Sequence, residues 1–183
     1  MNVKTLKKER VYNGVVFDIY RDECEYIISG NTTIREVVEH HGGSVIVPVL
    51  DDGRIIFIKQ FRYPIQKEIF ELPAGKLFPN EDPFLCAQRE LEEETGYIAN
   101  EWKHLTSMYT SPGFCSELLH IYLATKLTPA TDGRKLEEGE LGMELHLLSM
   151  SEAMQKIADK EIIDGKTIAG IMLASMFFKY DCK

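Results

Sequence analysis

The chain lacks several features that would define its class at once. Its four cysteines (Cys24, Cys86, Cys115 and Cys182) form no CxxC pair or other zinc-like spacing. We expect free thiols in a reducing cytoplasm, with a disulfide pair as the less favoured alternative. No apolar run approaches the roughly 20 residues that span a bilayer, and the basic N-terminus has no apolar segment typical of a signal peptide. We therefore predict a cytoplasmic protein without a membrane partner.

Positive charge is also scarce. The 183 residues include 21 Lys and Arg against 29 Asp and Glu, for a formal net charge of −8. A broad surface for nucleic acid or another polyanion is therefore not expected. The five histidines show no ligand spacing, and no repeat or low-complexity tract is present. Apolar residues make up 44% of the chain, enough for one globular unit with a sizeable core.

The first forty residues predict a small antiparallel sheet. Strand patterns cover Val11–Arg21, Glu25–Ile28 and Thr32–Glu39, and Ser29-Gly30-Asn31 has turn chemistry. Two or three strands with so little apolar area are marginal alone. We expect this sheet to lie against the rest of the chain or against a second subunit.

The remaining residues mix strand and helix patterns. Strands are predicted at 44–50, 54–61, 69–72, 103–108, 118–127 and 143–148, and helices at 83–95, 151–159 and 166–179. Asp51-Asp52-Gly53 predicts a hairpin between the first two of these strands. Asp82 and Pro83 predict the start of the first helix and Gly96 its end, whereas Ser151 is expected to cap the second. The order is not βαβα, which favours a mixed α/β fold over a doubly wound sheet.

The most informative segment, residues 75–97, reads GKLFPNEDPFLCAQRELEEETGY. On a helix, Glu90, Glu93 and Glu94 share one face, where like charges repel, whereas Glu92 lies off that face. A divalent cation would relieve this repulsion, and carboxylate oxygens are the ligands that Mg²⁺ prefers. The alternative is a solvated acidic helix face, the usual explanation of a charge run.

The spacing within this segment resembles the signature of the Nudix hydrolases. The matching positions are Gly75, Glu81, Arg89-Glu90-Leu91, Glu93-Glu94 and Gly96. Tyr97 departs from the bulky aliphatic residue that is usual at the last position, which we interpret as a packing variation. The resemblance implies an α/β/α sandwich with a mixed sheet over residues 42–183. It further implies that residues 1–41 form an antiparallel sheet that serves dimerisation and base binding.

The resemblance also implies the chemistry of the site. The implied metal ligands are Glu90, Glu93, Glu94 and the main-chain carbonyl of Ala74, with Glu93 and Glu94 also catalytic. Arg89 and Glu81 would pair and orient these carboxylates. The expected ion is Mg²⁺, with Mn²⁺ as a substitute. For the general base we expect Glu140 or, as second choice, Glu138, in a segment that is otherwise a mobile acidic loop.

The flanking sequences resemble the ADP-ribose pyrophosphatase branch of the family. They are QFRYP at 60–64, KEIFELPAG at 67–75, REVVEH at 35–40, SPGF at 111–114 and IDGKT at 163–167. The implied substrate-binding residues are Arg62, Glu71, Pro112, Gly113, Phe114 and Glu117. Arg62 as a plain strand residue, Pro112-Gly113 as an ordinary turn and a solvent role for Glu117 are the alternatives. Aromatic residues of the N-terminal strands would stack a purine or pack in a core; they are Tyr12, Phe17, Tyr20 and Tyr26.

The expected activity is therefore Mg²⁺-dependent hydrolysis of ADP-ribose or a related nucleoside diphosphate sugar to a nucleoside monophosphate and a sugar phosphate. A preference for GDP-mannose or a broad range of such sugars is the alternative enzyme. A ligand-binding Nudix protein without activity is the alternative of a different class. The branch also implies a homodimer.

Overall fold

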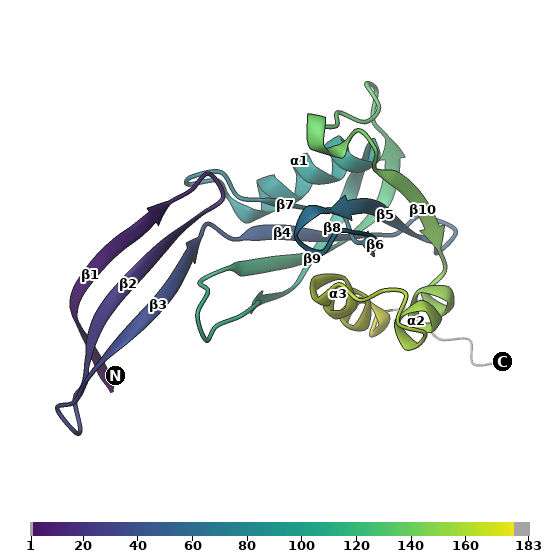
Figure 1. Cartoon of the computed structure of the whole chain (residues 1–183). Helices are drawn as coiled ribbons and strands as arrows, with labels where there is room; N and C mark the ends of the chain where they lie inside the picture. Colours follow the sequence, from purple (N-terminus) through teal and green to yellow (C-terminus); the bar gives the residue numbers. More distant parts are fainter. Residues whose placement is uncertain (1, 178–183) are drawn as a thin grey trace. The chain divides into compact units, whose positions relative to one another are not determined.

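The structure is a computed structural model that describes residues 2–177 (Figure 1). Contacts along the chain divide it into two compact units. The first unit runs up to Gly42 and also includes Met108–Leu118. The second unit holds Gly43–Ser107 and the described residues from Leu119 onward.

The first unit contains a three-stranded antiparallel sheet in the order β1-β2-β3. Its strands are β1 (Val3–Asn13), β2 (Phe17–Tyr26) and β3 (Thr32–His40). The predicted continuous strand at 11–21 is wrong, because a turn separates β1 from β2 at residues 14–16. Asp18 accepts a hydrogen bond from the Gly14 amide at 3.2 Å, and a Cβ at Gly14 would lie 2.5 Å from the Phe17 carbonyl oxygen. This close approach needs glycine, and it closes the hairpin.

The segment Met108–Leu118 belongs to the first unit because its backbone bonds to β3. The Val38 amide donates to the Phe114 carbonyl at 2.8 Å, and the Ser116 amide donates to the Val38 carbonyl at 2.9 Å. These two bonds add an extended piece of chain to the edge of the sheet. A segment more than seventy residues away in sequence thus supports the N-terminal strands.

The second unit is built on two sheets. One has the order β7-β4-β9-β8, from β7 (Ala74–Lys76), β4 (Gly43–Pro48), β9 (Leu118–Pro129) and β8 (Tyr97–Tyr109). The other has the order β10-β5-β6, from β10 (Glu144–Leu148), β5 (Ile55–Arg62) and β6 (Lys67–Glu71). The predicted hairpin is only partly right. The turn forms, with the Gly53 amide donating to the Leu50 carbonyl at 2.9 Å, but the two strands enter different sheets. Both edges of β4 are already occupied, by β7 and by the parallel strand β9.

The helices are α1 (Pro83–Thr95), α2 (Met150–Ala158) and α3 (Gly165–Ser175). The predicted start and end of α1 are confirmed: Asp82 accepts from the Phe84 amide at 2.8 Å, and Gly96 ends the helix with φ of 73°. The predicted cap of α2 is wrong by two residues, because Ser149 and not Ser151 accepts from the Glu152 amide. The last helix was predicted to extend to residue 179, but α3 ends at Ser175; residue 179 itself lies outside the described residues.

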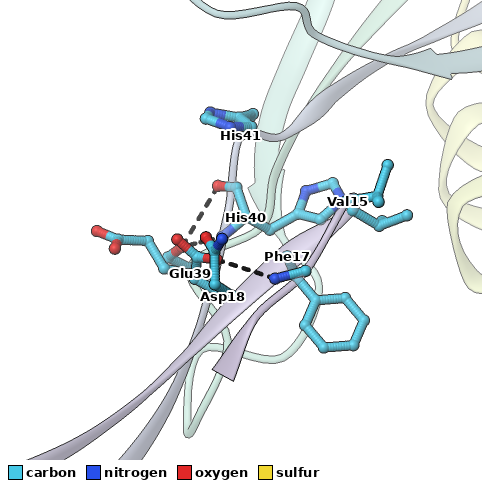
Figure 2. Close-up of a pocket in the computed structure, with 10 residues that line it drawn as sticks. Val15, Phe17, Asp18, Glu39, His40 and His41 are labelled. Carbon is cyan, nitrogen blue, oxygen red and sulfur yellow. Dashed lines mark hydrogen bonds between the residues drawn. The ribbon is translucent and has the colours of Figure 1, made fainter. Parts of the chain in front are cut away.

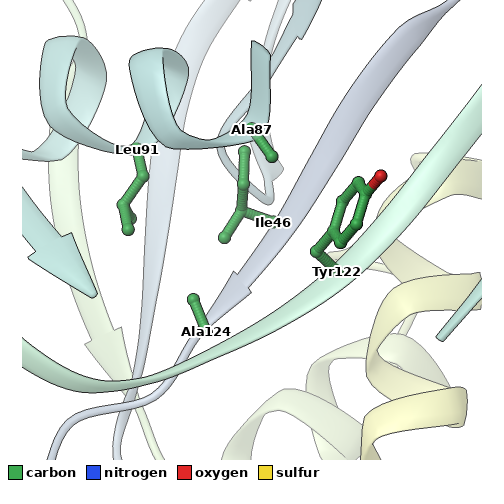
Figure 3. Close-up of a cluster of buried hydrophobic side chains, with 5 residues drawn as sticks. All are labelled: Ile46, Ala87, Leu91, Tyr122 and Ala124. Carbon is green, nitrogen blue, oxygen red and sulfur yellow. The ribbon is translucent and has the colours of Figure 1, made fainter. Parts of the chain in front are cut away.

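Helices α1 and α3 cover opposite faces of the four-stranded sheet. Ile46 of β4 and Tyr122 of β9 pack with Leu91 of α1 on one face (Figure 3). Side chains alternate along a strand, so Val47 and Ile121 point to the other face. There they meet α3 at Gly170, where a Cβ would lie 3.3 Å from Val47. This arrangement is the predicted sandwich, and the mixed α/β fold class is confirmed.

Cys24, Cys86 and Cys115 are free thiols, and Cys182 lies outside the described residues. No helix within residues 2–177 has the length and apolar character needed to cross a membrane.

Candidate active site

The carboxylates of α1 differ sharply in exposure. Glu90 is 7% exposed and Glu94 is 2% exposed, although both are charged side chains in a run of acidic residues. The side chain of Glu93 is 35% exposed. Glu92 points elsewhere and forms an ion pair with Lys135 at 2.8 Å. Helical spacing thus separates Glu92 from the two buried carboxylates.

The backbone of β7 lies directly against these two carboxylates. A Cβ at Gly75 would be 1.7 Å from Oε1 of Glu90, so a larger residue at this position would displace the Glu90 carboxylate. The Ala74 amide donates to Oε2 of Glu94 at 2.9 Å. Strand β7 and helix α1 therefore hold Glu90 and Glu94 in place from both sides.

Arg89 is the cation within this cluster. Its Nη1 donates to Glu90 at 2.5 Å and to Glu93 at 3.1 Å. Its Nε and Nη2 donate to the two carboxylate oxygens of Glu81 at 3.1 and 3.2 Å. One guanidinium thus contacts three carboxylates and does not hydrogen-bond to Glu94.

Burial and mutual repulsion disfavour the charged form of two carboxyls in the cluster. Burial raises the pKa of Glu90 to about 7, against the opposing effect of Arg89, and Glu93 and Glu140 add to the rise. Burial also raises the pKa of Glu94 well above its usual range, with repulsion from Glu90 as the next cause. Two buried carboxylates that disfavour their own charge are a place where a cation would be stabilised.

The donor set fits a divalent cation in charge and in atom type. Glu90, Glu93 and Glu94 present carboxylate oxygens, the ligands preferred by Mg²⁺ and Mn²⁺. Within residues 2–177, no three His, Cys, Asp or Glu side chains already converge as a ligand group. The contacts of Arg89 with Glu90 and Glu93 explain this, because the guanidinium occupies oxygens that a cation would share.

The two candidates for a general base lie in a short 3₁₀ turn, η2 (Glu138–Glu140), before β10. Glu140 is half-buried and lies close enough to Glu90 and Glu94 to raise the pKa of both. Its carboxylate accepts from the Glu137 amide at 3.0 Å, so the turn fixes it. Glu138 is exposed and has no such effect on the cluster. Of the two candidates, Glu140 is thus the less exposed and the one whose charge acts on Glu90 and Glu94.

Arg62 and Glu71 are joined at the ends of β5 and β6. Nε and Nη2 of Arg62 donate to the two oxygens of Glu71 at 2.5 and 2.6 Å. Lys166 also contacts Glu71 and pairs with Asp164 at 3.0 Å. Glu71 is fully buried, and its carboxylate is paired with the cations Arg62 and Lys166. Arg62 lies close enough to Glu94 that its charge lowers the pKa of that carboxyl.

The remaining predicted substrate residues lie in the first unit. Pro112, Gly113 and Phe114 form a turn in which the Ser111 carbonyl accepts from the Phe114 amide at 3.1 Å. Glu117 accepts from Thr110 Oγ1 at 2.8 Å. These contacts give the loop a defined shape and leave the Phe114 ring 57% exposed.

The first unit also contains a pocket of about 440 Å³ (Figure 2). The turn between β1 and β2 (residues 13–18) forms one side, and Glu39, His40, His41 and Ser116 form the other. Phe17 lines it, and the Tyr12 ring lies 6.1 Å from the Phe17 ring. Nδ1 of His40 accepts from the Gly42 amide at 2.9 Å, so its 3.6 Å approach to Glu117 is not an ion pair.

Two residues of the site were not expected from the sequence. Lys166 lies in the IDGKT segment, whose resemblance was noted without a role for the lysine. Arg134 donates to the Glu94 carbonyl at 2.6 Å, from a segment with no recognisable pattern. Their partners are 95 and 40 residues away, so no local signal connects them.

Comparison with known proteins gives the family. The NUDIX domain model matches residues 40–169, and the chain belongs to the Nudix family. The chain is 40% identical over 168 residues to an ADP-ribose pyrophosphatase of Bacillus subtilis (strain 168), covering 92% of this chain and 90% of that protein. It is 39% identical over 168 residues to a methanol dehydrogenase activator of Bacillus methanolicus, with the same two coverages.

A solved structure supports the fold. A crystal structure of an ADP compounds hydrolase superposes with a TM-score of 0.82 at 21% identity, covering 97% of this chain and 94% of that chain. At this level of identity the likeness concerns the fold alone. The family resemblance predicted from residues 75–97 is confirmed by the family model and by the relatives.

Proposed function

We propose that this protein is a pyrophosphohydrolase that cleaves ADP-ribose or a related nucleoside diphosphate sugar to AMP, or another nucleoside monophosphate, and a sugar phosphate. The observation that carries the proposal is the pair of buried carboxylates, Glu90 and Glu94, held against Gly75 by β7 and α1. Membership of the Nudix family and the similarity to an ADP-ribose pyrophosphatase support it.

Nudix hydrolases generally use a divalent metal ion, and we propose Mg²⁺, with Mn²⁺ as a substitute. Glu90, Glu93, Glu94 and the Ala74 carbonyl would hold it. When bound, such an ion lowers the pKa of water and offsets the charge of the pyrophosphate. Arg89, supported by Glu81, keeps Glu90 and Glu93 oriented.

The protein groups supply proton transfer and orientation. Glu140 is proposed as the general base that removes a proton from the attacking water as its oxygen bonds to phosphorus and the P–O bond of the leaving phosphate breaks. Glu138 is the second choice. Nη1 of Arg62 makes no hydrogen bond within residues 2–177. We propose that this nitrogen donates to a phosphate oxygen, whereas Glu71 holds the guanidinium in place.

The first unit is proposed to serve base binding and dimerisation. Its pocket beside Phe17 and Tyr12 offers aromatic surface for a purine, and Pro112, Gly113, Phe114 and Glu117 would line the substrate. The sheet has three strands, is marginally stable alone and carries several exposed apolar residues, which favours a homodimer. We propose a cytoplasmic protein, without a nucleic-acid or membrane partner, whose residues 1–41 and 42–183 act as the two domains.

A substrate panel tests the proposal. The protein is incubated with Mg²⁺ and ADP-ribose, GDP-mannose, diadenosine compounds or deoxynucleoside triphosphates, and phosphate products are measured. We expect the highest kcat/KM with ADP-ribose and no product when Mg²⁺ is chelated. A higher value with GDP-mannose would support the alternative enzyme.

The same panel also tests the alternative that the protein binds its ligand without hydrolysing it. Tight binding of ADP-ribose without turnover of any compound would support a ligand-binding Nudix protein. We expect turnover, because Glu81, Arg89, Glu90, Glu93 and Glu94 are all present.

A further inference from the structure

The segment that follows β9 is bonded to the C-terminal end of α1. The Ala130 amide donates to the Gly96 carbonyl at 2.8 Å, and the Lys135 amide donates to the Glu93 carbonyl at 2.9 Å. Carbonyls at a helix C-terminus have no partner within the helix. The segment from residue 130 to residue 143, the 130–143 segment, supplies such partners to the helix that carries the buried carboxylates.

Arg134 of this segment hydrogen-bonds to two main-chain carbonyls. Its Nε donates to the Glu94 carbonyl at 2.6 Å, and its Nη1 donates to the Met143 carbonyl at 3.0 Å. No carboxylate within residues 2–177 pairs with it, and its Nη2 is buried without a hydrogen-bond partner there. A cation at a helix C-terminus is stabilised by the helix dipole. The position of Arg134 is therefore set by two carbonyls and not by an ion pair.

These bonds form a continuous path from Glu94 to Glu140. The Glu94 carbonyl binds Arg134, and Arg134 binds the Met143 carbonyl. The Met143 amide in turn donates to the Glu140 carbonyl at 2.7 Å. The 130–143 segment also packs closely on Gly96, where a Cβ would lie 3.3 Å from the Arg134 amide nitrogen.

We infer that Arg134 is a positioning residue for Glu140: it fixes the loop that carries this carboxylate to the end of α1 that carries Glu94. The inference rests on the proposed function for the catalytic role of Glu140. Arg134 need not touch the substrate. Its contribution is to keep the proposed base at a constant distance from the buried carboxylates, and a displacement of about 1 Å in such a group can cost about 10²-fold in rate.

A double-mutant cycle tests the inference in the full-length protein with Mg²⁺ and ADP-ribose. We expect Glu140→Gln alone to lower kcat by about 10²-fold or more, as for loss of a general base. Arg134→Met should lower kcat by about 10-fold to 10²-fold with KM nearly unchanged. In the Glu140→Gln background, Arg134→Met should add little further loss, because the carboxylate that Arg134 positions is already absent. Losses that multiply would overturn the inference, because Arg134 would then act independently of Glu140.

Two variants control for general damage to the segment. Lys135→Met removes the neighbouring ion pair with Glu92 on the surface and should leave kcat unchanged. Arg134→Lys keeps the charge and one donor, and should recover part of the activity lost in Arg134→Met. Failure of Arg134→Lys to exceed Arg134→Met, or an equal loss in Lys135→Met, would contradict a positioning role.

Amide hydrogen exchange gives a readout that does not depend on turnover. The Met143 amide should exchange at least about tenfold faster in Arg134→Met than in the wild type, since the loop opens locally, and the rate in Arg134→Lys should lie between the two. Unchanged exchange would overturn the inference. If the wild-type protein hydrolyses nothing in the substrate panel, the proposed function fails, whereas the exchange measurement still decides whether Arg134 fixes the loop.

Discussion

Two sites in the second unit bury glutamates in opposite ways. Glu71 is fully buried and has two protein cations, Arg62 and Lys166, on its carboxylate. Glu94 is 2% exposed, and within residues 2–177 its carboxylate accepts one hydrogen bond, from the Ala74 amide. A buried charge is tolerated when it is paired, and otherwise it shifts its pKa.

The pKa values of the two carboxyls express this difference. Burial alone would raise the pKa of Glu71, but the hydrogen bonds from Arg62 and the charge of Lys166 lower it below its usual value. Burial raises the pKa of Glu94, and no comparable cation reverses the effect. Glu71 is thus an ionised partner in the structure, whereas the charged form of Glu94 is disfavoured and would be stabilised by an external cation. The same substitution, Glu→Gln, should therefore act differently at the two sites.

At Glu94, the substitution Glu94→Gln should abolish function without loss of stability. We expect kcat to fall by about 10³-fold, the scale of removing one preorganised charge from a catalytic site. Glutamine can still accept from the Ala74 amide and removes repulsion with Glu90, so the free energy of unfolding in chelator should stay equal or rise. Urea unfolding and steady-state kinetics measure the two effects. Retained turnover would show that Glu94 is not a metal ligand.

At Glu71, the substitution Glu71→Gln should instead destabilise the protein. It leaves Arg62 and Lys166 with one anion fewer in a buried position. Removing one partner of a buried ion pair costs about 3 kcal/mol or more. The urea midpoint should fall clearly relative to both the wild type and Glu94→Gln. Equal urea midpoints for Glu71→Gln and Glu94→Gln would show that the two buried carboxylates do not differ in their contribution to stability.

The pH dependence of stability should sharpen the same comparison. Because the pKa of Glu71 is lowered in the folded state, its contribution to stability is fully present above its unfolded pKa, about 4.3. The contribution is lost as pH falls through the folded pKa. The stability gap between wild type and Glu71→Gln should therefore be constant from pH 7 to about pH 5 and should narrow below about pH 4. A gap that stays constant down to pH 3 would show that Glu71 carries no such linkage.

The sequence predicts the local parts of this site well. The bounds of α1 follow from Asp82, Pro83 and Gly96, whose effects on the backbone act within one turn. The contact of Glu81 with Arg89 spans eight residues within the same segment. Such features depend on short-range geometry, and a regular spacing is sufficient to find them.

Long-range partners could not be found in this way. Lys166 meets Glu71 from 95 residues away, and the pairing of β4 with β9 in place of β5 depends on which edges are free in the folded sheet. Asn13-Gly14 is itself turn chemistry, but apolar residues lie on both sides of it, so residues 11–21 resemble one continuous strand and the turn at Gly14 was missed. Neither edge occupancy nor tertiary contact leaves a periodic signal in one sequence.

The smallest expected effect lies within the acidic run itself. Glu92 is adjacent in sequence to Glu93, but its partly exposed carboxylate pairs with the surface cation Lys135, at 2.8 Å. An exposed ion pair contributes about 0.2–1 kcal/mol, so Glu92→Gln should change the free energy of unfolding by less than about 1 kcal/mol. The rate of hydrolysis should be unchanged, because Glu92 is not turned toward Glu90 and Glu94. A loss of activity comparable to that of Glu94→Gln would mean that total charge, and not the face of the helix, determines the site.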